Sequence, residues 1–381
     1  MAGRSNTKTR EERERHAHTA QPGANGELPE GAVLLDYADS PPKPEDTLLG
    51  NRWLCRKGMG MLVGPSGRGK SSFTLQAAIH WSVGLPFLGI KPPQPLKIII
   101  FGCEDDAGDI YEIIRDARHH LQLSAEQTAL CRKNCRYYHY TEKSGLHFLT
   151  TIVDPLLNRD RPDLMLINPL LGYVGGDVRN PEITGPFLRN SLLPILDKYN
   201  VGAFIMHHTP KTNFRTTGKW SSVDWQYAAA GNADLTNAMR CILVLEPTAL
   251  SHVFRLMAPK RGQRVGWEDD YGHTQFEQFV AWEKDSIWWR AATPQEIREA
   301  KTVKKEKAPA EDVFDLVPES GDIWKEELIA LVVEHFDVSE TTGKKRINQL
   351  IARRKLTERL VPRPGNRPAV YLSRTTKNDD Q

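Results

Sequence analysis

The sequence has no long apolar run. Nowhere in its 381 residues do about 18 apolar residues follow one another, which is the length that a membrane-spanning helix needs. The first residues, MAGRSNTKTREERERH, are charged and include no apolar segment of the kind found in secretion signals. We therefore expect neither membrane insertion nor secretion, and a cytoplasmic location.

Cysteine is also scarce, at five residues. An odd, scattered set in a long chain argues against a disulfide framework and indicates reduced thiols. One alternative stays open, because Cys131 and Cys135 have histidines near them and could ligate zinc, although the tight Cys-x-x-Cys spacing is absent. The other cysteines are Cys55, Cys103 and Cys241, and the histidines near the pair are His119, His120 and His139.

Acidic residues are nearly absent from the carboxyl-terminal part. Between Thr341 and Lys377, eleven basic residues stand against one acid, Glu358. Because the whole chain carries a net charge of +3 and this segment carries +10, the rest carries −7. Such asymmetry is typical of a nucleic-acid-binding segment on an acidic body.

Composition divides the chain into five parts. Residues 1–45 are rich in charge, proline and glycine, and have too little apolar surface to offset the entropy of ordering, so we expect a flexible arm. Residues 46–292 predict one large domain. A polar linker at 293–310, a small domain at 311–375 and a tail at 376–381 follow.

Six short apolar runs predict the strands of the large domain. Their apolar residues are continuous rather than alternating, which is typical of strands buried on both faces. With helical patterns between them, they predict an α/β fold with a mostly parallel sheet. The runs are Met61–Gly64, Ile98–Cys103, Leu164–Asn168, Ala203–Met206, Cys241–Glu246 and Val253–Met257.

The small domain has the pattern of a winged helix-turn-helix. A short helix at AEDVFDLV, a second that Asp322 can cap and a third from about Glu340 precede two strands, LTERLV and AVYL. We expect the third helix to enter the major groove of duplex DNA and the hairpin to form the wing. The expected DNA contacts are Lys344, Lys345, Arg346, Arg353 and Arg354 on the helix, and Arg363 and Arg367 on the wing.

The strongest local signal is GPSGRGKS, which fits the phosphate-binding pattern G-x-x-x-x-G-K-[ST] between a strand and a helix. Its glycines let backbone N–H groups turn toward phosphates. Lys70 would then reach the β- and γ-phosphates of ATP, and the Ser71 hydroxyl would ligate Mg²⁺. The expected nucleotide-binding residues are Gly64, Pro65, Ser66, Gly67, Arg68, Gly69, Lys70, Ser71 and Ser72.

Hydrolysis also needs a group that orients and deprotonates water. Glu104 follows the run IIIFGC at the end where a phosphate would bind, and Asp105 or Asp106 beside it is a candidate for holding Mg²⁺. An ordinary acidic loop is an equal alternative. The run LMLI ends in Asn168, where P-loop enzymes usually have a metal-organising aspartate, so we expect weaker Mg²⁺ binding.

The ordered motifs resemble those of RecA-like ATPases of the plasmid RepA type, which are related to the DnaB-like hexameric helicases. The resemblance covers Leu48 to Arg264. It rests on LLGNRWLCRKGMGMLVGPSGRGKSSF, FGCEDD, DLMLINPLLGYVGGD, FIMHHTPK, AAAGNADLTNAMRCILVLEP and LMAPKRG. It implies a RecA-like P-loop core in which Glu104 is the catalytic carboxylate and Asn168 occupies the Walker B position.

The same resemblance assigns roles to four later residues. It implies that His208, rather than His207, senses the γ-phosphate. It also implies that Arg240 is an arginine finger or a related interface residue, and that Lys260 and Arg261 reach the nucleotide of a neighbouring subunit. A plain surface charge is the alternative for each cation.

The segment that follows the histidines, KTNFRTTGKWSSVDWQYAAAG, mixes cations with aromatic residues. This mixture suits unpaired nucleic-acid strands. In RecA-like rings the corresponding loop lines the DNA channel, and a lid whose aromatics pack on the domain is an equal alternative. The cations are Lys211, Arg215 and Lys219.

The sequence thus predicts an ATP-hydrolysing, DNA-binding protein that uses Mg²⁺. A helicase or initiator-type ATPase of a plasmid, phage or other mobile element is the leading hypothesis, assembled as a homo-oligomeric, hexameric ring. A regulatory DNA-binding ATPase that does not unwind DNA is the second. A P-loop kinase for a small metabolite is the third, and the basic segment and the motif series disfavour it.

Overall fold

The computed structural model describes residue 31 and residues 33–209, 233–283, 286–302, 308–336, 338–363 and 366–375. The chain divides into two compact units, Met1–Thr47 and Leu48–Gln381. Of the expected flexible arm, residues 1–30 lie outside the described part. The rest contains two single turns of 3-10 helix, η1 (Leu34–Tyr37) and η2 (Pro44–Asp46), and the apolar side chains of η1 are exposed.

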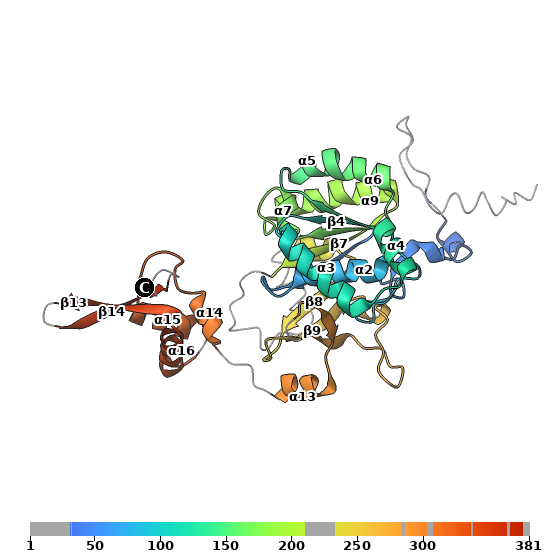
Figure 1. Ribbon diagram of the computed structural model, residues 1–381. Coiled ribbons are helices and arrows are strands. Elements are labelled where there is room, and N and C mark those ends of the chain that lie inside the picture. Colours follow the sequence, from blue (N-terminus) through green and yellow to red (C-terminus); the bar gives the residue numbers. More distant parts are fainter. Residues whose placement is uncertain are drawn as a thin grey trace, which may run out of the picture. The chain divides into compact units, whose positions relative to one another are not determined.

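A nine-stranded sheet with the order β11-β10-β9-β8-β3-β7-β6-β4-β5 organises the second unit (Figure 1). Neighbouring strands from β8 to β5 are parallel, whereas β9, β10 and β11 extend one edge with antiparallel pairs. The strands are β3 (Met59–Gly64), β4 (Ile98–Gly102), β5 (Cys135–His139), β6 (Leu164–Asn168), β7 (Gly202–His208), β8 (Cys241–Pro247), β9 (Val253–Lys260), β10 (Glu277–Trp282) and β11 (Trp289–Ala291). Two short strands, β1 (Thr47–Leu49) and β2 (Leu54–Cys55), form a separate pair.

The predicted α/β fold with a mostly parallel sheet is confirmed, and each of the six apolar runs is a strand. Three strands of the sheet were not predicted. Their sequences are CRYYH, EQFVAW and WRA, and none is apolar throughout, although β10 contains the short apolar run FVAW. Strands β5 and β11 are the two edge strands and β10 lies next to β11. Burial is incomplete in all three, so the apolar signal is weaker.

Both faces of the sheet are buried. Along β3, Leu62 belongs to one hydrophobic core and its neighbours Met61 and Val63 belong to another, because successive side chains of a strand point to opposite faces. Helices α2 and α3 cover the face of Leu62. The helical segments between β5 and β7 cover the other face.

The helices of this part vary widely in length. Two of the longer segments contain a π-helical turn, η3 or η4, inside an otherwise α-helical run. No helix among the described residues is long and apolar enough to span a membrane. The helical elements are α2 (Lys70–Ser82), α3 (Ala107–Leu121), α4 (Ala125–Asn134), α5 (Gly145–Phe148), η3 (Leu149–Val153), α6 (Asp154–Asp160), α7 (Leu171–Val174), α8 (Pro181–Gly185), η4 (Pro186–Leu192), α9 (Leu193–Tyr199), α12 (Ala233–Ala238) and η5 (Gly262–Arg264).

The carboxyl-terminal part has its own hydrophobic core, to which Val313, Leu328, Ile347 and Leu372 belong. Its elements are α14 (Ala310–Phe314), β12 (Ile323–Trp324), α15 (Lys325–Phe336), α16 (Glu340–Ala352), β13 (Leu356–Arg363) and β14 (Asn366–Arg374), with the strand order β12-β14-β13.

Strand β12 was not expected, and it changes the role of Asp322. Because β12 separates Asp322 from α15, this residue does not cap the helix. Its carboxylate accepts hydrogen bonds from the guanidinium of Arg359 on β13 instead.

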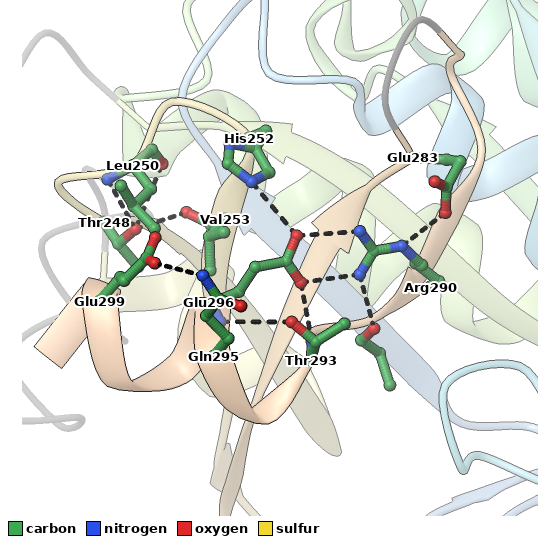
Figure 2. Close-up of polar contacts among 11 residues, drawn as sticks. Thr248, Leu250, His252, Val253, Glu283, Arg290, Thr293, Gln295, Glu296 and Glu299 are labelled. Carbon is green, nitrogen blue, oxygen red and sulfur yellow. Dashed lines mark hydrogen bonds and ion pairs between the residues drawn. The ribbon is translucent and has the colours of Figure 1, made fainter.

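The polar segment predicted as a linker, 293–310, contains a helix, α13 (Pro294–Thr302). Thr293 and Glu296 form a capping box, in which each side chain accepts a hydrogen bond from the backbone N–H of the other, at 3.2 and 2.7 Å. Figure 2 shows that Glu296 also accepts a bidentate pair from Arg290, at 2.8 and 2.9 Å, and lies 3.2 Å from His252. The helix is therefore attached to the sheet by charge-assisted contacts. The polar composition of the segment predicted a linker because it gives no sign of these contacts.

Glu296 makes stability depend on pH. Hydrogen bonds from Arg290 are the main cause that lowers the pKa of the Glu296 carboxyl from 4.5 to about 2. A pKa lowered by folding gives a stabilisation that is complete above pH 4.5 and is lost as the pH falls toward 2. Glu296→Gln should lower the midpoint of thermal unfolding by roughly 2 to 4 °C at pH 7 and by less at pH 3.

Glu299→Gln on the same helix is the matched control, because its side chain is exposed. Thermal unfolding followed by circular dichroism at both pH values tests the prediction. An equal loss in the two variants at pH 7 would contradict it.

Candidate functional site

Parallel strands bring the predicted site residues to one edge of the sheet. Gly64 at the end of β3 is the register partner of His208 at the end of β7. Gly102 at the end of β4 is the partner of Asn168 at the end of β6. The segments that follow these strands therefore leave the sheet side by side, as expected of a nucleotide site in an open α/β sheet.

The loop after β3 has the conformation that a phosphate-binding loop requires. Gly67 and Gly69 have φ angles of +67° and +74°, a left-handed region that other residues rarely adopt. Gly69 directly precedes α2, so the amino terminus of this helix faces the loop.

Lys70, the first residue of α2, folds back over this loop. Its side chain is only 4% exposed, and its Nζ donates a hydrogen bond to the Pro65 carbonyl at 2.6 Å. Burial lowers the pKa of the Lys70 ammonium to about 8, and the charge of Glu104 opposes this shift. The loop therefore holds a buried cation that phosphate oxygens would stabilise.

Three oxygen-bearing side chains meet beside Lys70. The Nδ2 of Asn168, which is 4% exposed, donates hydrogen bonds to Ser71 Oγ at 3.0 Å and to Asp105 Oδ2 at 3.4 Å. Burial is the main cause that raises the pKa of the Asp105 carboxyl. The Ser71 hydroxyl and the Asp105 carboxylate are oxygen ligands of the kind that Mg²⁺ prefers and that phosphates and water usually complete, whereas Asn168 presents its Nδ2–H group to both.

Glu104 and His208 form a second group at this edge. The His208 Nε2 lies 3.5 Å from Glu104 Oε2, and the hydrogen bond from His208 is the main cause that lowers the pKa of the Glu104 carboxyl. The charge of Lys70 lowers this pKa further, so the carboxylate is ionised at neutral pH. The Glu104 side chain is also half exposed. A group that orients water must be both ionised and accessible.

The structure favours His208 over His207 as the histidine of the site. Successive side chains of a strand point to opposite faces, so His207 does not share the direction of His208. His207 is also buried, at 4% exposure, whereas the side chain of His208 is 23% exposed.

The three acids of FGCEDD have three different surroundings. Glu104 faces His208 and Asp105 faces Asn168, as described above. Asp106 caps α3 by accepting hydrogen bonds from the N–H groups of Gly108 and Asp109, at 2.6 and 2.9 Å. The sequence did not separate Asp105 from Asp106.

The cations assigned to a neighbour's nucleotide lie at the opposite edge of the sheet. The Arg240 N–H donates to the Met59 carbonyl at the start of β3, about 17 Å from the phosphate-binding loop at its end. Burial lowers the pKa values of Lys260 and Arg261, and the charge of Arg240 lowers both further. We call Arg240, Lys260, Arg261 and Arg264 the cationic cluster, and no carboxylate among the described residues pairs with it.

The loop cations Lys211, Arg215 and Lys219 lie outside the described residues, as do the side chains of Arg363 and Arg367. Lys344, Lys345, Arg353 and Arg354 are exposed, as predicted, and the first two lie on α16. The helix ends at Ala352, so the predicted placement of the two arginines on it is wrong. Arg353 is the C-cap residue and Arg354, with a φ angle of +55°, lies beyond it. Arg346 does not fit the predicted outer face, because it is half-buried and donates to Gln349 Oε1 at 2.9 Å.

The acidic residues of the carboxyl-terminal part compensate the charge of α16. Over residues 311–375, eleven basic residues stand against eleven acidic ones. The excess of +10 is therefore confined to residues 341–377, and the small domain as a whole is neutral. Lys344 pairs with Glu340, and Arg353 pairs with Glu311. Lys345 and Arg354 have no such partner in the described part of the chain.

The zinc alternative finds no support in the described part of the chain, where no three His, Cys, Asp or Glu residues gather in a way that could hold a metal ion. Cys131 and Cys135 line an apolar pocket of about 520 Å³ beside α2, α3 and α4. The five cysteines are free thiols.

Two site neighbours escaped the sequence analysis. Trp282 and Trp289, on β10 and β11, pack against the phosphate-binding loop, and Trp289 donates hydrogen bonds where the loop enters α2. More than 200 residues separate Trp289 from this loop, and no local pattern connects the two.

The pKa of Lys70 predicts that nucleotide affinity depends on pH. A bound phosphate would raise the pKa of Lys70 from about 8, so ADP binding at higher pH must take up a proton. The dissociation constant of ADP should therefore rise by up to about tenfold per pH unit above pH 8. Titration of a fluorescent ADP analogue at pH 7, 8 and 9 measures this.

Lys70→Met is the matched variant. It should bind ADP at least about tenfold more weakly at pH 7, and its affinity should not fall between pH 8 and 9. A wild-type affinity that is constant over that range would show that the Lys70 ammonium does not contribute as described.

Comparisons with known proteins agree with the site. Residues 25–213 match the model of a family described as an AAA domain. No curated protein sequence matches the chain. A solved structure whose title names an ATPase domain is similar over 62% of this chain and 86% of that one, with a TM-score of 0.43 and 10% sequence identity. With its mostly parallel sheet and its phosphate-binding loop, the chain thus carries an ATPase-type P-loop domain.

Proposed function

We propose that this chain hydrolyses ATP to act on DNA, as a RepA-type helicase or initiator ATPase of a plasmid, phage or other mobile element. The observation that carries the proposal is the convergence of Lys70, Ser71, Glu104 and His208 at one edge of the sheet. This convergence supports hydrolysis rather than binding alone, because the carboxylate lies beside the phosphate loop.

The chemistry follows from these positions. Lys70 and the loop N–H groups hold the β- and γ-phosphates, while Glu104 accepts a hydrogen bond from the attacking water and orients it. His208 lowers the pKa of Glu104 by a hydrogen bond and would lie near the γ-phosphate. Ser71, Asp105 and Asn168 would hold Mg²⁺, which withdraws charge from the phosphates.

Assembly completes the site. The cationic cluster lies a strand length away from the loop of its own chain, so it cannot stabilise charge there. Against the loop of a neighbouring copy, Arg240 would act as an arginine finger, and Lys260 and Arg261 would contact the nucleotide. The absence of described carboxylate partners supports an anionic partner for the cluster, and a homo-oligomeric ring provides one.

The carboxyl-terminal part would bind duplex DNA as a winged helix. Its order of elements, with α16 before the hairpin β13–β14, supports this assignment. Exposed acids such as Glu326 and Glu327 lie on α15, and exposed cations lie on α16. This separation gives a neutral domain one basic side suited to phosphates.

A regulatory ATPase that does not unwind DNA is the second candidate. Asn168 favours it, because an uncharged amide at the metal position weakens Mg²⁺ binding and slows turnover. In that case ATP would control assembly on DNA.

Stimulation by DNA tests the leading proposal. We expect ATP hydrolysis to rise at least about tenfold with single-stranded DNA and less with duplex DNA, because the ring acts on unpaired strands. Glu104→Gln should bind ATP and hydrolyse it at least about 100-fold more slowly. Phosphate release is measured without DNA and with each form. Hydrolysis that no nucleic acid stimulates would favour the small-molecule kinase.

Salt dependence tests the duplex-binding surface. Replacing both Lys345 and Arg354 by alanine should weaken duplex binding and reduce the slope of log K against log salt by about 2, since two phosphate contacts are lost. Replacing both Lys344 and Arg353 is the matched control, because each is paired with a glutamate and should contribute less. Fluorescence anisotropy at several salt concentrations separates the two variants. Unchanged slopes in both would assign this surface to another partner.

A further inference from the structure

The last strand of the sheet touches the phosphate-binding loop through one side chain. In the sheet order, β11 lies four positions from β3, yet the Trp289 side chain reaches the first turn of α2. The indole is 1% exposed. Its Nε1–H donates to Ser72 Oγ at 3.0 Å and points toward the Gly69 carbonyl at 3.3 Å.

The backbone of Trp289 is tied to the same helix. The Gln76 side chain forms a reciprocal pair with it, in which Gln76 Nε2 donates to the Trp289 carbonyl at 2.7 Å and the Trp289 N–H donates to Gln76 Oε1 at 2.8 Å. Gln76 is 2% exposed, so both bonds are shielded from water. The indole is therefore fixed relative to α2 from both ends of the residue.

Aromatic packing holds the indole in place. Its ring centroid lies 5.2 Å from that of Phe254, 5.5 Å from that of Trp282 and 5.7 Å from that of Phe73. Trp282 reaches the loop as well, because a Cβ added to Gly69 would lie 3.0 Å from its indole. Two tryptophans thus pack against one glycine of the loop.

Gly69 is the residue whose conformation these contacts control. Its φ angle of +74° turns the loop into α2, and its carbonyl accepts hydrogen bonds from Ser72 Oγ and the Phe73 N–H, both at 2.9 Å. Trp289 donates to the same hydroxyl and the same carbonyl. The indole N–H of Trp289 therefore restrains the Gly69–Lys70 peptide, which connects the loop to α2.

From this geometry we infer that Trp289 is a positioning residue for the phosphate-binding loop. Its indole N–H holds Ser72 and Gly69 in the arrangement that receives the phosphates of a nucleoside di- or triphosphate. The β10–β11 hairpin thereby sets nucleotide affinity from a distant part of the sequence. The inference rests on the proposed nucleotide-binding function.

Trp289→Phe tests it, because phenylalanine retains the aromatic packing and removes the donor. We expect ADP to bind about threefold to tenfold more weakly, as for the loss of one buried hydrogen bond. The maximal rate at saturating ATP should change by less than about twofold, because the loop is restored when nucleotide occupies it.

Trp81→Phe is the matched control. Trp81 is a buried tryptophan of α2, the helix that Trp289 contacts, and is 0% exposed. Its Nε1–H donates to the Ile90 carbonyl at 3.0 Å, away from the loop. It should lose a similar amount of thermal stability and bind ADP as the wild type does. A purely structural role of Trp289 predicts equal ADP affinity in the two variants.

Ser72 gives a second measurement, through the coupling between its side chain and that of Trp289. Ser72→Ala removes the acceptor of Trp289 without changing the aromatic core. Combined with Trp289→Phe, it should weaken ADP binding by less than the product of the two single effects, because both remove one interaction. Should Trp289→Phe fail to fold, Ser72→Ala must weaken binding and Ser72→Thr, which keeps the hydroxyl, must not.

Fluorescent ADP titration and thermal unfolding are measured on every variant of the full chain. Wild-type protein that binds no ADP overturns the proposed function itself. Wild-type protein that binds ADP, with Trp289→Phe and Trp81→Phe both unaffected, overturns only the role of Trp289. Strict multiplicativity of the Trp289 and Ser72 effects also overturns it.

Discussion

The parallel direction of neighbouring strands is the constraint on which the nucleotide site depends. Parallel strands require a crossover between each pair, and their carboxyl ends then meet at one edge. Phosphate loop, Glu104, Asn168 and His208 come from four strand ends of this kind. Burial on both faces holds the strands in register, so the packed sheet fixes groups that are far apart in the chain.

Positive charge without a carboxylate partner lies at both ends of the parallel strands. At the carboxyl edge, Lys70 is a buried cation whose contacts are a backbone carbonyl and the nearby charge of Glu104. At the opposite edge, the cationic cluster has no described carboxylate partner. On β11, by contrast, Arg290 is neutralised locally by Glu283 and Glu296. Both edges thus retain positive charge that an anion would stabilise.

The hairpin β10–β11 connects the site to the following helix. One side of it packs against the phosphate loop through Trp282 and Trp289. Its end continues into α13, which Arg290 and Glu296 attach to the sheet.

The sequence by itself determined the α/β class, six of the nine strands and the phosphate loop, because burial on both faces and a short glycine pattern are local properties. The position of Glu104 at a strand end made it a candidate, and resemblance added His208. Tertiary structure decided what each neighbour does: Asp106 caps a helix while Asp105 meets Asn168. It also decided the contacts that no sequence pattern links, such as that of Trp289 with Ser72 and those of the acids that pair with cations of α16. Such pairings depend on which strand ends and helices meet in space, and the spacing of residues along the chain does not predict them.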